Sequence, residues 1–166
     1  MTVPVPLRIL ALTVATTAFY TLVGQLVPQK EVHPPKEAEL KKDMSSDQMV
    51  AAGKEIFEGK GLCTTCHTLG KSGALRFPDL AGIGARAASR REGHSDVAYL
   101  AESIYEPNLY VVPGFNPGMP VINKPPIGLT DQEILAVIAY LQSLGGKVSV
   151  TMESKVWPLP AAGGAQ

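Results

Sequence analysis

Hydrophobic residues occur along this chain as one unbroken apolar run followed by three segments of helical period. The run covers residues 9–27 and contains no charged side chain. In the later segments apolar residues return every three or four positions, from about residue 46, over residues 96–105 and over residues 130–144. This spacing places apolar side chains on one face of a helix. We therefore expect one long apolar helix and three amphipathic helices.

Residues at the ends of these segments are those that begin and end helices. Ser45 with Gln48, and Thr130 with Glu133, have the spacing of capping boxes, in which each partner satisfies a free backbone amide. Pro107 follows the middle segment and would stop it, because proline cannot continue a helix. The first and last amphipathic helices are therefore expected to begin directly after Ser45 and Thr130.

Two further features predict how these helices meet and how they are joined. Gly53 lies inside the first amphipathic helix, where glycine costs about 1 kcal/mol relative to alanine. A close crossing of two helices would explain it, and the last helix, with Tyr140, is the expected partner. Residues 108–128 are dense in proline and glycine, so we expect a loop without regular structure there.

The apolar run at residues 9–27 is long enough to cross a bilayer, which takes roughly 20 apolar residues. Signal peptides have shorter apolar cores of about 7–15 residues, followed by a small-residue cleavage site, and no good cleavage site follows this run. An uncleaved single-pass anchor over residues 1–28 is therefore favoured over a cleaved signal. Lysines are more numerous after the run than before it, so charge alone would place the C-terminal side in the cytoplasm.

The remaining chain divides by composition into three parts. Residues 29–46 mix both signs of charge with a Pro-Pro pair, which predicts a polar linker without a core. Residues 47–146 hold the amphipathic helices and are expected to form one domain. Residues 147–166 form a tail, and its Trp157 is expected either to fold back on the domain or to dock on another subunit.

Candidate chemistry is concentrated in Cys63, Cys66 and His67, which stand in the order Cys-x-x-Cys-His. Each thiol can add to a vinyl group of a porphyrin, and the adjacent imidazole can then bind the iron. A zinc site would need a fourth ligand, and a redox-active dithiol would need a strand–helix–strand pattern around it. A plain disulfide would leave His67 unexplained. The motif therefore indicates one covalently attached haem c.

A haem that transfers electrons needs a second axial ligand, which is often a methionine. Met119 lies in the sequence Gly-Phe-Asn-Pro-Gly-Met-Pro, and a loop of this composition has little backbone entropy to lose on ordering. Of the other methionines, Met1 is the initiator, Met44 and Met49 precede the haem motif at the start of a helical pattern, and Met152 lies in a polar part of the tail. His94 is the competing ligand, but it stands in what reads as a solvated turn. We predict His67 and Met119 as the iron ligands.

The haem motif and the Met119 loop, in this order and between these helices, resemble the class I c-type cytochrome family over roughly residues 47–145. The resemblance implies an all-α fold, here with an N-terminal transmembrane helix. It also implies that the Pro78 carbonyl accepts a hydrogen bond from the His67 imidazole. Arg86 resembles a position whose side chain reaches a haem propionate. Haem of this type is attached outside the cytoplasm, which implies that the domain lies on the periplasmic side of the cytoplasmic membrane, against the lysine count.

The function implied is one-electron transport by a protein that is not itself an enzyme. The membrane segment and apolar tail favour a subunit of a respiratory or photosynthetic complex, with the mono-haem subunit of an alternative complex III as the most specific hypothesis. Two alternatives remain: a free-standing tethered shuttle between complexes, and a haem enzyme or gas sensor with an open iron site. The expected apolar wall of the haem pocket consists of Leu69, Leu75, Phe77, Leu80, Ile83, Tyr105, Val111, Val112 and Phe115.

The net charge of the chain narrows the kinds of binding partner that can be expected. The chain has 15 Lys and Arg and 15 Asp and Glu, so its formal net charge is +0. A neutral chain does not predict a nucleic-acid partner. The domain itself is slightly acidic, so no basic face predicts docking on an acidic partner. The expected partners are the membrane, redox proteins and other subunits of an electron-transfer complex, whose identities the sequence does not contain.

Overall fold

A computed structural model describes residues 3–28 and 40–159 of the chain. The chain divides into two units, residues 1–34 and residues 35–166. All regular structure in the described residues is helical, with no β-strand, which confirms the expected all-α class. Most of the predicted linker, together with the end of the tail, lies outside the described residues.

The first unit contains α1, Val5–Leu26, a helix of 22 residues. At 1.5 Å per residue this helix is about 33 Å long, close to the roughly 30 Å of a bilayer's hydrocarbon core. None of its residues is buried, and large apolar side chains such as Leu12 and Leu26 are exposed on it. Its length and apolar composition suit a membrane span, and the same two properties are also found in signal sequences.

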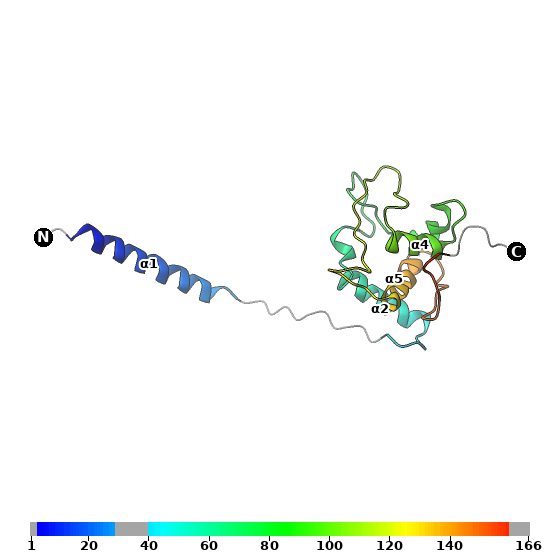
Figure 1. Cartoon of the computed structure of the whole chain (residues 1–166), viewed down its shortest axis with the longest axis horizontal. Helices are drawn as coiled ribbons and strands as arrows, with labels where there is room; N and C mark the ends of the chain where they lie inside the picture. The colour runs from blue at the N-terminus through cyan, green and yellow to red at the C-terminus, as the bar shows by residue number, and fades with distance from the viewer. Residues whose placement is uncertain (1–2, 29–39, 160–166) are drawn as a thin grey trace. The chain divides into compact units, whose positions relative to one another are not determined.

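The second unit is built from three longer helices: α2, Ser46–Glu58; α4, Asp96–Tyr105; and α5, Asp131–Ser143. Three short turns complete it: η1, Cys63–Thr65; α3, Ile83–Arg86; and η2, Ala87–Ser89. Figure 1 shows α2, α4 and α5 gathered into one body, with long irregular segments between them. Residues 108–128 contain no regular element, as their proline and glycine content predicts.

Side-chain caps set the starts of these helices where the sequence predicts them. Ser45 and Gln48 form a capping box at α2, and Thr130 and Glu133 form one at α5. The Glu133 carboxylate also accepts a hydrogen bond from Lys60 Nζ at 2.7 Å, which ties the chain after α2 to the first turn of α5. Burial alone would raise the pKa of Glu133, but the hydrogen bonds from Lys60 and Thr130 outweigh it and lower that pKa.

The core of the domain lies between α2 and α5, which cross at Gly53. A Cβ atom added to Gly53 would lie 1.9 Å from the Ala136 carbonyl oxygen and 3.0 Å from the Tyr140 Cβ. Only glycine therefore allows the two backbones to approach this closely. Phe57 and Tyr140 pack beside the crossing with ring centroids 5.3 Å apart. The predicted crossing, including its partner residue Tyr140, is confirmed.

The C-terminal segment folds back onto the domain. Val150, Met152 and Val156 are buried in its core, and each such burial stabilises the fold by roughly 1.5–3 kcal/mol. Trp157 stacks on Tyr105 with ring centroids 5.2 Å apart and planes 3° from parallel. The expectation that Met152 lies in a polar tail is therefore wrong. Of the two alternatives for Trp157, the described residues show the fold-back.

Buried Gln142 joins this segment to α5. Its amide nitrogen donates to Asp96 Oδ2 at 2.6 Å and to Ser149 Oγ at 2.8 Å, and its amide oxygen accepts from the Ser149 amide at 3.1 Å. The side chain has no exposed surface. All its donors and acceptors are used, so it can be buried without the cost of an unsatisfied amide.

Replacing Gly53 with alanine is expected to destabilise the domain by about 1–3 kcal/mol, because the added methyl group overlaps the Ala136 carbonyl. In an open helix the same change would stabilise by up to about 1 kcal/mol, so the sign of the effect is diagnostic. Urea unfolding of the haem-loaded domain measures it. Lys54→Ala, at an exposed position of the same helix, is the control and should change stability by less than about 0.5 kcal/mol. A stabilised Gly53→Ala variant would contradict the crossing.

Candidate functional site

A cavity of about 340 Å³ opens into the domain and is lined mainly by apolar side chains. Phe57, Leu100 and Leu141 reach it from three helices, α2, α4 and α5. The predicted wall residues Phe77, Leu80, Ile83, Val111, Val112 and Phe115 also line it. Volumes of roughly 300–1,000 Å³ are typical of sites that bury a small ligand. The cavity is therefore a candidate site for a flat apolar cofactor.

Three predicted wall residues do not line this cavity. Leu69 is exposed, Leu75 lies away from it, and Tyr105 stacks on Trp157 with its hydroxyl bonded to Asp131 Oδ1 at 2.7 Å. The phenol of Tyr105 is buried next to the Asp131 carboxylate, and both effects raise its pKa above the usual range for tyrosine. The expected wall was wrong at these three positions. For Tyr105 the reason is that its contact with Trp157 of the C-terminal segment is not visible in a local pattern.

Cys63, Cys66 and His67 all line the cavity, because the short turn η1 curls them toward it. Leu62, in the left-handed conformation with φ 54°, turns the chain into η1, and the His67 amide then donates to the Cys63 carbonyl at 2.8 Å. The two cysteines are not joined in a disulfide. Burial raises the pKa of the Cys63 thiol to about 11, so this sulfur is a neutral thiol at physiological pH.

The imidazole of His67 is oriented by the Pro78 carbonyl, which lies 2.9 Å from its Nδ1. When the proton is on Nδ1, His67 donates this hydrogen bond and its Nε2 keeps a free lone pair. A carbonyl partner of this kind is typical of histidines that bind a metal through the other nitrogen. The contact that the resemblance implied for Pro78 is therefore present.

Asp79, the residue after Pro78, links several parts of the segment that follows the haem motif. Its carboxylate accepts hydrogen bonds from the Thr68 hydroxyl at 2.6 Å and from the amides of Gly70, Lys71 and Ala81 at 2.9–3.1 Å. These donors, above all the Thr68 hydroxyl, hold the pKa of Asp79 well below its usual range. The network fixes the backbone that carries the Pro78 carbonyl.

Met119 lines the same cavity as His67, and His94 does not. The expectation that His94 lies in a solvated turn is wrong. Its side chain is only 18% exposed, and its Nε2 lies 3.3 Å from the Glu102 carboxylate. The signal that could have found this contact is Glu102 itself, which falls on the apolar face of α4 and needs partners there.

Arg86 is not among the residues that line the cavity. Its guanidinium donates to two backbone carbonyls, that of Ala81 and that of Asp79, the latter at 2.8 Å. Another arginine, Arg90, does line the cavity. The role of Arg86 at a haem propionate remains a prediction from the resemblance.

The site fits the covalent haem that the resemblance implies. Two thiols, an imidazole and a thioether line one apolar cavity, and these are the groups that bind a porphyrin covalently and hold its iron. In residues 3–28 and 40–159 no three His, Cys, Asp or Glu side chains converge as a separate metal site. The residues that would hold haem are therefore Cys63, Cys66, His67 and Met119.

Several residues of the cavity were not expected from the sequence. They are apolar or aromatic side chains of the helices: Phe57, Tyr99, Leu100, Ile104, Val137 and Leu141. Apolar helical spacing predicts that helices pack on one another, and it does not show that a cavity lies between them. The same faces serve both purposes, because the cavity lies between the helices that pack together.

Comparison with known proteins supports this interpretation. The model of one protein family, described as Cytochrome c, matches residues 50–145. That range holds most of α2, all of α4 and α5, and the residues that line the cavity. No curated protein matches the chain in sequence.

Replacing Asp79 with asparagine is expected to destabilise the domain at neutral pH, because an amide keeps one acceptor oxygen while its NH2 group would face donors that now bind the second carboxylate oxygen. The folded-state pKa of Asp79 is lowered, so its stabilising effect is complete above the unfolded pKa of about 3.9 and is lost as pH falls through the folded pKa. Chemical unfolding at several pH values measures this. The difference between wild type and Asp79→Asn should shrink below about pH 4, and a difference that stays constant with pH would contradict the assignment.

Proposed function

Because this chain belongs to the cytochrome c family, we propose that it carries single electrons with an iron held between His67 and Met119. Members of the family bind haem c covalently, and one haem suits a domain with a single Cys-x-x-Cys-His motif. When bound, this haem supplies an iron that takes up and releases one electron. The observation that carries the ligand assignment is that His67 and Met119 line the same cavity.

Each site residue has a distinct role in this proposal. Cys63 and Cys66 hold the cofactor through thioether bonds, so it cannot dissociate. Pro78 fixes the His67 ring through the hydrogen bond to its Nδ1 at 2.9 Å, which directs Nε2 into the cavity. Met119 contributes a thioether from a loop in which it is flanked by Pro117 and Pro120, whose rings restrict the backbone.

These residues favour a comparatively high reduction potential. A thioether ligand stabilises ferrous over ferric iron relative to a second imidazole. The apolar side chains around the cavity act in the same direction, since a low dielectric disfavours the form with more positive charge. No substrate has to reach the iron, so the chain needs no general acid or base there and acts as a carrier, alone or within an oxidoreductase complex.

We assign α1 the role of an uncleaved membrane anchor within residues 1–28, joined by the linker of residues 29–46 to the haem domain of residues 47–146. The support is a 22-residue apolar helix with no buried residue. The domain would lie on the periplasmic side of the cytoplasmic membrane, where haem of this type is attached. Tethering would raise the effective concentration of the carrier near its partners.

The favoured setting is a subunit of a larger respiratory or photosynthetic complex, such as the mono-haem subunit of an alternative complex III. A free-standing tethered shuttle is the second candidate. The fold-back of Trp157 onto Tyr105 removes one argument for the complex, because this apolar residue is already satisfied within the domain. An enzyme or gas sensor would need an open iron site, and Met119 at the cavity argues against it.

Replacing Met119 with alanine is expected to abolish the weak absorption band of sulfur bound to ferric iron and to lower the potential. The fall should be a sizeable part of the roughly 0.8 V range that axial ligands span. Absorption spectroscopy and redox titration measure both effects, and the opened site should bind carbon monoxide rapidly when reduced. Met44→Ala, at a partly buried methionine outside the cavity, is the control. An unchanged spectrum, or rapid binding of carbon monoxide by the wild type, would overturn the assignment.

Full-length protein is expected to remain in washed membranes and to require detergent for extraction, whereas a variant lacking residues 1–28 behind an added export signal should be released as a soluble haem protein. N-terminal sequencing of the mature protein distinguishes an anchor, which is retained, from a signal, which is removed. Native electrophoresis in mild detergent then separates the two settings. Migration with large hydrophobic subunits supports a complex, and a lone 17.6 kDa haem protein supports the shuttle.

A further inference from the structure

We propose that Arg90, and not Arg86, is the residue that pairs with a carboxylate of the bound haem. The inference rests on the proposed function, since it presupposes haem in the cavity. It concerns which of two arginines, four positions apart, supplies the positive charge next to the cofactor.

Arg90 lines the cavity, and its Nε is buried without a hydrogen-bond partner among the described residues. A buried donor without a partner destabilises the fold, and the cost is larger when the group is charged. Native proteins rarely tolerate this, so such an atom calls for an acceptor that the protein itself does not supply. A carboxylate is the acceptor that suits guanidinium best, because it can accept two parallel N–H bonds.

Arg86 has no such need. Its guanidinium already donates to the Ala81 carbonyl and, at 2.8 Å, to the Asp79 carbonyl. These bonds hold the backbone on both sides of Leu80, and the arginine does not line the cavity. To reach a propionate, Arg86 would have to break contacts that stabilise the segment after the haem motif.

The other charged groups at the cavity leave this role to Arg90. Of the described residues that line it, Arg90 is the one arginine or lysine, and Asp79 is the one carboxylate. The Asp79 carboxylate is saturated by donors of its own segment, including the Thr68 hydroxyl at 2.6 Å. Arg90 is therefore not neutralised from within the wall, and a cofactor carboxylate would balance its charge.

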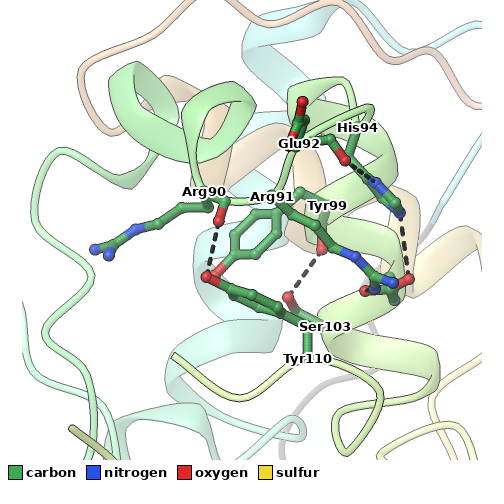
Figure 2. Close-up of polar contacts among 8 residues, drawn as sticks. Arg90, Arg91, Glu92, His94, Tyr99, Ser103 and Tyr110 are labelled. Carbon is green, nitrogen blue, oxygen red and sulfur yellow. Dashed lines mark hydrogen bonds and ion pairs between the residues drawn. The ribbon is translucent and has the colours of Figure 1, made fainter. Parts of the chain in front are cut away.

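The surroundings of Arg90 hold its backbone in place at the cavity. Figure 2 shows Arg90 and Arg91 pointing in opposite directions. Arg91 pairs with buried Glu102, which also faces His94. The hydroxyl of Tyr110 donates to the Arg90 carbonyl at 2.8 Å, and the Tyr110 ring packs edge-on against Tyr99 at 6.0 Å. Both tyrosines line the cavity, so this cluster fixes the position of Arg90 at its edge.

An arginine in this position would keep the paired carboxylate ionised and offset its charge. Without the arginine, the uncompensated negative charge would stabilise ferric iron and lower the potential. The carboxylate would also take up a proton at a higher pH than before. Its protonation would then be coupled to reduction of the iron. The reduction potential of the variant would therefore depend on pH in a range where the potential of the wild-type protein does not.

The test compares Arg90→Gln with Arg90→Lys in the haem-loaded, full-length protein, with the potential measured from pH 4 to pH 9 by spectroelectrochemistry. Arg90→Gln should lower the potential at alkaline pH and move the onset of pH dependence upward toward neutrality. Arg90→Lys should restore most of the wild-type profile, because it keeps the charge. Arg76→Gln removes the same charge from an exposed residue outside the cavity lining and should leave the profile unchanged.

Two results would overturn the proposal: a wild-type profile in Arg90→Gln, or the same upward shift in Arg86→Gln alone. Haem content, read from the absorption of the purified variants, is the second readout. Arg90→Gln with its haem attached and a wild-type profile refutes the role of Arg90 and leaves the proposed function intact. Wild-type protein without covalent haem would refute the proposed function itself.

Discussion

The close crossing of α2 and α5 at Gly53 is the contact on which the rest of the domain depends. Because residue 53 has no side chain, the two backbones meet at the Ala136 carbonyl. Helix α2 ends at Glu58, a short distance before Cys63, so the helix held at this crossing leads directly into the haem motif. The Lys60–Glu133 pair, at 2.7 Å, ties the chain after α2 to the first turn of α5. A structural contact between helices thus positions the residues that carry the chemistry.

The segment between His67 and Arg86 is held in shape by its own polar groups. The Pro78 carbonyl accepts from His67, the Asp79 side chain gathers donors from both sides, and Arg86 clamps the carbonyls of Asp79 and Ala81. This segment has little regular structure, so such bonds replace the ladder of a helix. The orientation of the imidazole is therefore set by hydrogen bonds within the protein itself.

The arginines of the domain illustrate how similar residues acquire different tasks. Arg86 donates hydrogen bonds to backbone carbonyls, and Arg91 pairs with the buried Glu102. Arg90 lies at the cavity, and its Nε has no hydrogen-bond partner among the described residues. Their sequence positions do not separate these roles. The separation comes from which carbonyls and carboxylates lie within reach of each guanidinium, and only folding brings those groups near.

Much of the fold could be predicted from the sequence because the signals are local. Capping boxes at Ser45 and Thr130, the stop at Pro107 and the helical periods depend on residues only a few positions apart. The haem motif is local too, and Met119 stands out by the composition of its loop. The crossing at Gly53 was predictable because an interior glycine needs a reason to be there, and close approach of a second backbone is a common one.

The chain's local chemistry by itself determined the class of protein, the cofactor and the starts of two amphipathic helices, and it predicts which residues would bind haem. Tertiary structure alone decided that Val150, Met152 and Trp157 fold back on the domain, that His94 faces Glu102, and that Arg90 reaches the cavity where Arg86 does not. The physical reason is that burial and pairing depend on groups that are distant along the chain. No pattern within a few residues records which of them will meet.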